Sequence, residues 1–170
     1  VTVSWFQILN SFFIITLASS FSKLWEKVWN PSGPVKFALG LIFVAVGFFA
    51  LSYGSLSIPQ GAKTATVSMI WLILAYFFHT LGELCLSPVG LSYVSKLSPK
   101  KFVGLLFGFW FTASAIANYI AGYTGAYIDK ISAMYSLSTF FIIIAALPLS
   151  AALMLLLFNK KLVKMMHGIK

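Results

Sequence analysis

Residues 67–94 read VSMIWLILAYFFHTLGELCLSPVGLSYV, and this stretch is long and apolar enough to cross a lipid bilayer as a helix. Near its middle stands Glu83, one of only three acidic residues in the chain. A charged side chain at this depth costs about 2.5–3.5 kcal/mol on insertion scales. A helix accepts such a cost where the side chain faces a wet cavity, a cation or a ligand, so Glu83 is predicted to be functional.

The whole chain has the composition of an integral membrane protein. Of its 170 residues, 60% are hydrophobic and only 9% are charged, which is too little polar surface for a soluble domain. The net charge of +9 comes from lysines that lie between apolar runs, without any arginine. Because arginine is the usual reader of phosphates and base edges, we exclude nucleic acid as a partner. The single cysteine, Cys85, excludes an internal disulfide framework.

Four other apolar runs accompany this one, so the sequence predicts five membrane spans. The predicted spans are residues 5–23, 37–53, 67–94, 103–123 and 137–158. The runs are continuously apolar rather than alternating, which favours helices over the strands of a lipid-facing barrel. The joints between them carry helix-breaking residues, as in Asn30–Pro34, Ile58–Gly61 and Ser98–Lys101. The predicted fold class is therefore an all-α membrane protein.

The lysines divide unevenly between the two predicted sides of the membrane. Ten fall at alternate joints and the C-terminus: Lys23, Lys27, Lys36, Lys96, Lys100, Lys101, Lys160, Lys161, Lys164 and Lys170. The opposite side has Lys63 and Lys130. The positive-inside rule then predicts a cytoplasmic C-terminus. Five spans would leave the N-terminus outside, and we explain this by expecting further helices before Val1.

Polar and helix-perturbing residues surround Glu83. His79 and Ser87 lie four residues before and after it, so we expect all three to share one helix face. His79 is either a proton carrier or a packed histidine, and one His with one Glu is too few ligands for a metal site. Pro88 removes a backbone hydrogen bond and is expected to kink or loosen the helix around Leu84. A broken, polar helix at mid-membrane indicates a transport site.

The fourth predicted span carries a stripe of residues that can contact a ligand. Trp110, Ser114 and Asn118 recur every four residues, and Phe111 lies beside them. Tryptophan usually lies at the headgroups, so Trp110 within a span indicates a pocket wall that donates one hydrogen bond. The alternative is helix packing through small residues on another face, namely Gly104, Gly108, Ala113, Ala117 and Ala121.

The first predicted span opens with two amide side chains. Gln7 and Asn10 are three residues apart and so face roughly the same way. An amide offers both a donor and an acceptor, which suits a ligand carboxylate or a peptide bond. An interhelical hydrogen bond is the alternative role.

Four segments are similar to those of a known family. They are WFQILN at Trp5–Asn10, PVKFALGL at Pro34–Leu41, HTLGELCLSPVGLS at His79–Ser92 and GFWFTASAIANYIAG at Gly108–Gly122. With them the chain resembles the C-terminal half of the proton-dependent oligopeptide transporters, within the major facilitator superfamily. The resemblance implies that the five spans are helices eight to twelve of a twelve-helix fold with both termini cytoplasmic. It also implies that the N-terminal helices of the same protein are missing from this chain.

The resemblance implies an activity: proton-coupled symport of di- and tripeptides by alternating access, with protons as coupling ion and no other cofactor. Glu83 then matches the acid that faces the peptide's amino group, and Asn10 matches an asparagine near the peptide's carboxyl end or backbone. Ile8 and Ser11 depart from the family pattern, which usually has Ser and Pro at these positions. The local bend of the first span and some of its polar contacts are therefore expected to differ.

Further positions receive roles from the same resemblance. Trp110, Phe111 and Ser114 match side chains that line the central pocket. Ser87 and Pro88 lie where the helix bends during gating. The protein is expected to be a multi-pass component of the plasma or inner membrane, with the lipid bilayer and its own N-terminal helices as partners.

Three alternatives remain open at the level of sequence. An intramembrane hydrolase would need a base beside a nucleophile, but Ser87 is two helical turns from His79. A membrane scaffold would need no acid at mid-depth. A related transporter could carry another small solute, such as nitrate, an amino acid or a drug.

Overall fold

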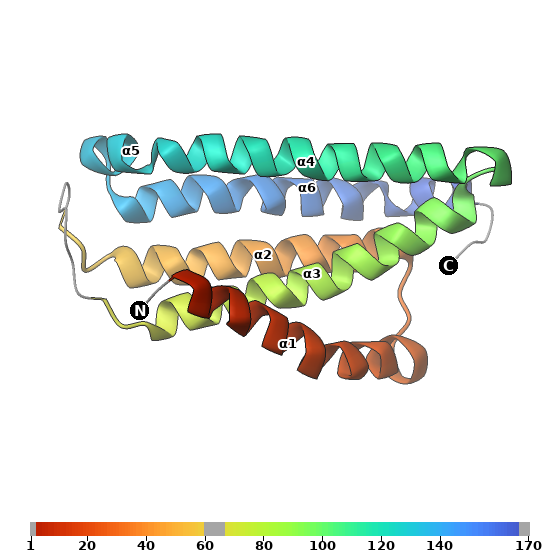
Figure 1. Cartoon of the computed structure of the whole chain (residues 1–170), viewed down its shortest axis with the longest axis horizontal. Helices are drawn as coiled ribbons and strands as arrows, with labels where there is room; N and C mark the ends of the chain where they lie inside the picture. Colours follow the sequence, from red (N-terminus) through yellow and green to blue (C-terminus); the bar gives the residue numbers. More distant parts are fainter. Residues whose placement is uncertain (1–2, 60–66, 167–170) are drawn as a thin grey trace.

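The computed structural model describes residues 3–59 and 67–166, with side chains from residue 8 onward (Figure 1). Five long helices dominate: α1 (Val3–Lys23), α2 (Gly33–Ser55), α3 (Ile70–Leu97), α4 (Val103–Ala126) and α6 (Leu137–Met165). Short elements join them: η1 (Leu24–Val28), η2 (Lys100–Phe102) and α5 (Ile128–Met134). Each long helix contributes to a segment that is long and apolar enough to cross a membrane. The chain is therefore an all-α membrane protein.

The ends of the helices differ from the predicted ranges for local reasons. α2 takes Pro34 into its first turn, where the missing N–H has no intrahelical partner to lose. α3 begins at Ile70, whose N–H donates to the Ser68 hydroxyl at 3.4 Å. α6 continues past Phe158 to Met165, because the lysines that follow are good helix formers.

α3 runs through Pro88 as one uninterrupted helix. The helix is therefore not broken at Pro88, and the kink or loosening expected around Leu84 stays a prediction. The helix continues because a proline removes only one N–H donor, and the hydrogen bonds of the neighbouring residues hold the turn together.

α2 is the centre of the described bundle, with α3 packed on one side and α6 on the other. Its interfaces are built from small buried residues, which include Ala38, Ala45, Ala75, Ala145 and Ala152. Gly40 of α2 and Gly82 of α3 meet backbone to backbone, since a Cβ on either would come within 2.9 Å of the other's carbonyl oxygen. Small residues allow this close approach. In lipid the hydrophobic effect does not drive helices together, so van der Waals packing of this kind stabilises the pair.

Polar side chains tie α2 to α6 at two levels. The buried hydroxyls of Ser52 and Ser138 share a hydrogen bond of 2.8 Å between their oxygens. At the start of α2, the Ser32 hydroxyl donates to the side-chain oxygen of Asn159 at 2.8 Å. The α2–α6 pair is thus held by packing and by hydrogen bonds.

α4 stands apart from the other long helices. None of its residues, all of which the structure describes, is buried. α4 overlaps α6 in Figure 1, but among the described residues its backbone comes close only to α3, α5 and η2. Most of the surface of α4 is therefore not covered by the rest of the described chain.

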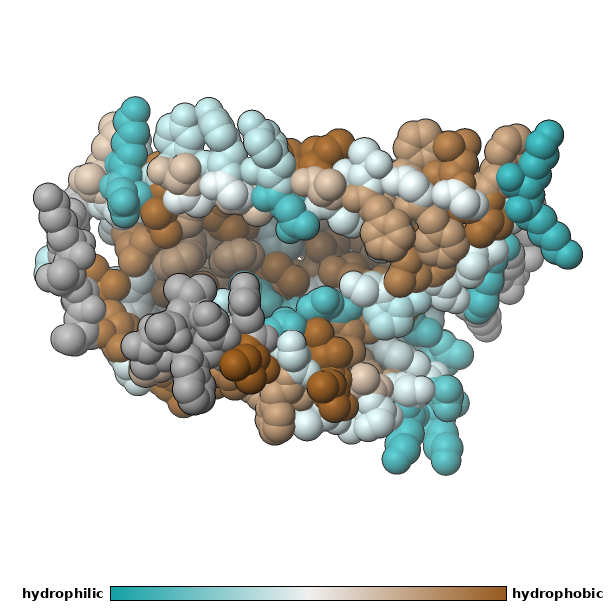
Figure 2. All heavy atoms as spheres, in the orientation of Figure 1, coloured by the Kyte–Doolittle hydropathy of each residue, from teal (hydrophilic) through white to brown (hydrophobic). Residues whose placement is uncertain are grey.

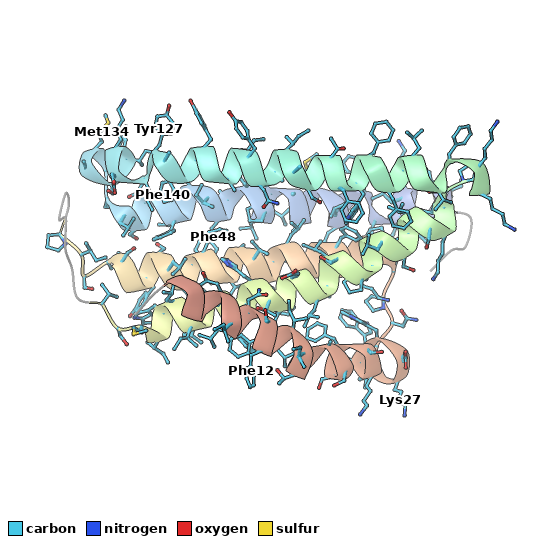
Figure 3. All side chains as sticks on the ribbon, viewed as in Figure 1. Phe12, Lys27, Phe48, Tyr127, Met134 and Phe140 are labelled. Carbon is cyan, nitrogen blue, oxygen red and sulfur yellow. The ribbon has the colours of Figure 1, made fainter. Side chains whose placement is uncertain are left out.

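The two ends of the bundle differ in charge. The turn at η1, the turn at η2 and the end of α6 lie at one end, on the right of Figure 1. The described lysines cluster there, except for Lys130 in α5. Figure 3 labels Lys27 at this end and Tyr127 and Met134 at the other. Lys63 and Lys170 lie outside the described residues.

Candidate functional site

Glu83 lies halfway along α3, as the fourteenth of its 28 residues. At 1.5 Å per residue it is about 20 Å from either end of the helix. Gly82, Leu84 and Cys85 beside it are buried, whereas Glu83 itself is exposed. The fold thus holds a carboxyl group at mid-depth on a face of α3 that the described chain leaves uncovered.

α1 brings an amide to this carboxyl group. The side-chain nitrogen of Asn10 donates to Glu83 Oε2 at 3.4 Å and to Thr80 Oγ1 at 3.3 Å. The rings of Phe13 and Phe77 meet edge to face one turn away, with their centroids 5.5 Å apart, and hold α1 against α3. The structure therefore brings together Glu83 and Asn10, which the sequence placed on separate helices.

Thr80 is the member of this group that the sequence reading missed. It is fully buried, and its hydroxyl donates to the carbonyl oxygen of Tyr76 at 2.8 Å. The Asn10 amide nitrogen donates to both Thr80 and Glu83, so the amide oxygen is the group left to accept from a ligand. The signal in the sequence was the spacing of three residues between Thr80 and Glu83, which also places two side chains on one face.

His79 does not share the face of Glu83, contrary to the expectation from its spacing. Its ring packs on α2, 4.7 Å from the ring of Phe48 between centroids. A Cβ on Gly47 would come within 2.7 Å of two atoms of the imidazole, so the ring fills the space that this glycine leaves. A four-residue step leaves the two side chains only about 40° apart around α3, and the difference arises because α2 packs on the side of His79 whereas α1 meets Glu83. His79 is a packed histidine between α2 and α3.

Trp110 contacts α3, and its predicted place in the wall of a central pocket stays a prediction. Its ring occupies the space in front of Gly90, where a Cβ would lie 2.1 Å from the nearest ring atom. Together with Phe37 and Tyr93 it lines a shallow pocket near the turn that joins α3 to α4. Trp110 thus anchors the start of α4 on the last third of α3.

The other predicted residues of α4 are exposed. Phe111 is 61% exposed, and Ser114 and Asn118 are exposed as well. The Ser114 hydroxyl donates to the Trp110 carbonyl oxygen at 3.0 Å, within its own helix. A Cβ on Gly104 or Gly108 would meet nothing within 4 Å in the described chain. Apart from Trp110, neither the polar stripe nor the small-residue face is therefore used in packing inside the described bundle.

Three other predicted residues lie on α1 and α3. Ser87 and Pro88 are exposed one turn beyond Glu83 on α3. Gln7 belongs to α1, but its side chain lies outside the described residues.

Figure 2 shows a hollow in the molecular surface with an apolar floor, which runs between the side formed by α4 and the side formed by α1 and α3. The arrangement offers one carboxylate and one amide oxygen on an open wall.

Comparisons with known proteins point to one family. A sequence model described as the POT family matches residues 1–143. The chain is 38% identical over 158 residues to the peptide transporter YePEPT of Yersinia enterocolitica subsp. palearctica, covering 90% of this chain and 30% of that protein. It is 31% identical over 169 residues to a di-/tripeptide transporter of Lactococcus lactis subsp. cremoris, covering 98% of this chain and 33% of that protein.

A solved structure agrees with these relatives. The crystal structure of the peptide transporter POT in complex with sulfate matches with a TM-score of 0.75 and 36% sequence identity. The match covers 92% of this chain and 31% of that one. The chain therefore spans about a third of the length of the proteins that it matches.

Proposed function

The chain belongs to the POT family, and on that premise we propose that the intact protein carries di- and tripeptides across a membrane by proton-coupled symport. The relatives named as peptide and di-/tripeptide transporters support this substrate class. The observation that carries the proposal is the contact between Asn10 and Glu83 at mid-depth.

Glu83 and Asn10 are the proposed receptor for the amino end of the peptide. A peptide ammonium donates hydrogen bonds and carries a positive charge, so it fits the Glu83 carboxylate and the remaining amide oxygen of Asn10. A hydrogen bond with charged partners is roughly twice as strong as a neutral one. The pair therefore selects for a substrate with an unblocked amino end.

The coupling to protons is proposed to act through the same carboxyl group. A proton and a peptide ammonium both interact with the Glu83 carboxylate, so occupancy by one changes the affinity for the other. The cycle needs protons as the coupling ion and makes or breaks no covalent bond in the substrate. It calls for neither a bound cofactor nor a metal.

The remaining wall of the cavity is proposed to come from α4. Phe111, Ser114 and Asn118 are exposed there, and Trp110 stands at the edge of this surface. Alternating access would rock this bundle against the rest of the intact protein, with Ser87 and Pro88 where α3 bends. The partners of the chain are then the other helices of the same protein, the bilayer and the peptide.

The lysine-rich end is proposed to face the cytoplasm, which gives a cytoplasmic C-terminus in the plasma or inner membrane. Support comes from the clustering of the described lysines at the end that includes η1 and η2. The side chains that would contact headgroups at the opposite end include Tyr123 and Tyr127, whose hydroxyls share a hydrogen bond of 2.8 Å.

Uptake by the intact protein in liposomes tests this function. With an inward proton gradient, the wild type should accumulate a labelled dipeptide, and Glu83→Gln should lower uptake by at least about tenfold, because a hydrogen bond to a charged group is lost. Asp129→Asn removes a similar charge in α5, far from the site, and should leave uptake unchanged.

Two outcomes would contradict the proposal. If Glu83→Gln took up the dipeptide at the wild-type rate, the result would support a scaffold or a carrier of another kind. If free amino acids or nitrate inhibited uptake as strongly as unlabelled dipeptides do, the substrate would belong to another class of small solute.

A further inference from the structure

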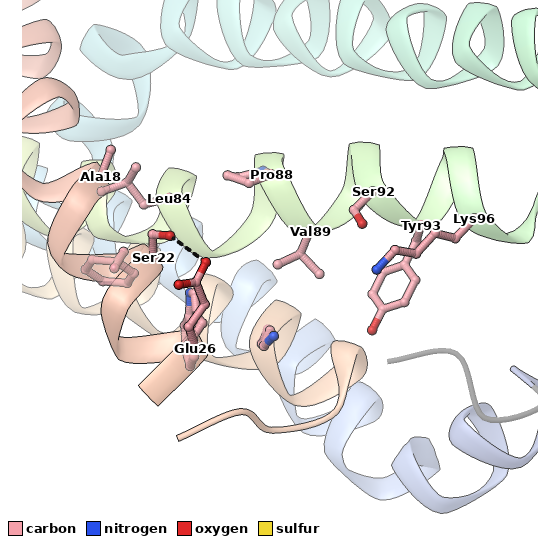
Figure 4. Close-up of a pocket in the computed structure, with 12 residues that line it drawn as sticks. Ala18, Ser22, Glu26, Leu84, Pro88, Val89, Ser92, Tyr93 and Lys96 are labelled. Atoms are coloured by element: carbon pink, nitrogen blue, oxygen red, sulfur yellow. Dashed lines mark hydrogen bonds between the residues drawn. The ribbon is translucent and has the colours of Figure 1, made fainter. Parts of the chain in front are cut away.

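A second cavity lies away from Glu83, between the last turns of α1 with η1 on one side and α3 on the other. Its volume is about 410 Å³, and neither Glu83 nor Asn10 lines it. Figure 4 shows the labelled residues of α3 in order along the cavity, from Leu84 through Val89 to Lys96. Pro88 also lines it, but the residues proposed to bind the peptide do not.

The end of the cavity near the lysine-rich turns is charged. Lys36 Nζ donates to the side-chain oxygen of Asn30 at 2.8 Å, and Lys96 is close enough for the two ammonium groups to repel each other. Glu26 on the η1 wall accepts a hydrogen bond from the Ser22 hydroxyl at 3.2 Å (Figure 4). Two lysines against one glutamate leave an excess of positive charge, which an anion would neutralise.

An unused hydrogen-bond donor lies in the same wall. The indole nitrogen of Trp25 is buried and, within the described part of the chain, donates to no acceptor. Lys36 Nζ lies 5.2 Å from the centroid of the same ring. A buried donor without an acceptor is unfavourable, so an acceptor oxygen brought to this nitrogen would stabilise the site.

The other end of the cavity is apolar. Ala18 and Phe21 of α1 line it together with Leu84 and Val89 of α3. Both helices run toward the lysine-rich end, so these residues lie deeper in the bilayer than Glu26, Lys36 and Lys96. The cavity is therefore amphipathic along the membrane normal, with charge at the headgroup level and hydrocarbon below.

We propose that this cavity is a binding site for one anionic phospholipid. The phosphate lies between Lys36 and Lys96 and accepts from the Trp25 indole, and an acyl chain lies along the apolar half beside Leu84 and Val89. A diffuse attraction of lysines to anionic lipids is general at such surfaces. Here the cavity and the unused Trp25 donor would instead hold the phosphate of one lipid at a single place.

Native mass spectrometry of the intact, delipidated protein tests the proposal. Phosphatidylglycerol should bind about tenfold more tightly than phosphatidylcholine with the same acyl chains, because only the former has a net negative charge. The double variant K36Q and K96Q should lose about tenfold in affinity for phosphatidylglycerol. The matched double variant K160Q and K161Q, on α6 at the same end, should keep it, since neither lysine lines the cavity.

A milder variant tests the site without removing charge. Trp25→Phe keeps the ring and deletes the N–H, so it should lower the affinity for phosphatidylglycerol about threefold without lowering the melting temperature in lipid-free detergent. Equal binding of the two lipids would exclude a preference for an anionic lipid, and equal losses in both lysine pairs would reduce the effect to general surface charge. Either result would overturn the site. Displacement of the lipid by inorganic phosphate at the same concentration would remove the role of the acyl chain and overturn it too.

Discussion

At the residue level, Asn10 is positioned from two directions. Its amide nitrogen bonds both Glu83, which is exposed, and Thr80, which is buried and bonded in turn to the Tyr76 carbonyl. The buried Thr80 hydroxyl fixes the position of the Asn10 amide, and the amide in turn orients the Glu83 carboxyl group. Thr80 is thus a positioning residue that has no contact of its own with a ligand in this arrangement.

Thr80→Val should therefore weaken binding of a dipeptide to the intact protein by about threefold to tenfold, the value of one hydrogen bond. Valine keeps the shape of threonine but cannot accept from Asn10. Thr80→Ser should restore most of the affinity. Titration calorimetry with a dipeptide measures the change.

Thr16→Val is the matched control for this experiment. Thr16 lies on the same helix as Asn10 and also bonds a backbone carbonyl, that of Phe12 at 2.8 Å, but it is exposed. Affinity that falls equally in both variants would assign the effect to loss of a hydroxyl in general, and Thr80 would have no positioning role.

Residue spacing predicted part of this site and misplaced another part. The depth and charge of Glu83 in an apolar run indicated its importance, and the amide of Asn10 indicated a hydrogen-bonding partner. The direction of His79 depended on which helix packs on that side of α3, and α2 with Gly47 occupies it. A four-residue spacing contains no information on neighbouring helices, so the expectation for His79 failed.

At the level of helices, the crossing of α2 and α3 depends on two facing glycines. Gly82→Ala would place a methyl group 2.8 Å from the Gly40 carbonyl oxygen and 2.7 Å from a Val44 side-chain atom. Because the first contact is with backbone, the helices must move apart, and we expect a loss of about 1–3 kcal/mol in stability. The melting temperature of the intact protein in detergent should fall accordingly.

Gly104→Ala provides the comparison on α4. A Cβ there meets nothing within 4 Å in the described chain, so the bundle itself does not oppose it. The melting temperature of this variant should stay at the wild-type value or rise slightly, since alanine favours helix over glycine. If Gly82→Ala were as stable as Gly104→Ala, the close crossing of α2 and α3 would be refuted.

Pro88 offers a test of the proposed bend in α3. Pro88→Ala restores the backbone bond to Leu84 and stiffens a helix that is already continuous. We expect the maximal uptake rate to fall a few-fold while the affinity for a dipeptide in detergent stays the same. An unchanged uptake rate would show that α3 does not need to bend there.

The apolar runs predicted where the helices are, because length and hydropathy decide which segments can span lipid. The exact ends depended on local chemistry: Pro34 in the first turn of α2, and the lysine-rich extension of α6. The role of α4 could not be predicted, because none of its residues is buried in the described bundle.

For the whole molecule, the distribution of lysines gives a prediction of orientation. In an otherwise cysteine-free intact protein, Lys130→Cys in α5 should react with a membrane-impermeant maleimide on whole cells. Lys161→Cys on α6 should react only after the cells are permeabilised. The opposite pattern would reverse the membrane topology.

The chain spans about a third of the length of the relatives that it matches. α2 and α6 are packed together, whereas α1, α3 and α4 border the hollow seen in Figure 2. Transport therefore has to be measured on the intact protein.

The central claim is that a mid-membrane carboxylate receives the ammonium of a peptide, and a cycle of two substitutions tests it most directly. The affinity of Ala-Ala and of its N-acetylated form should be measured for the wild type and for Glu83→Gln by calorimetry on the intact protein. We expect acetylation to weaken binding to the wild type by at least about tenfold and to make little further difference once Glu83 is neutral. Equal losses on acetylation in both proteins would mean that Glu83 and the ammonium do not meet.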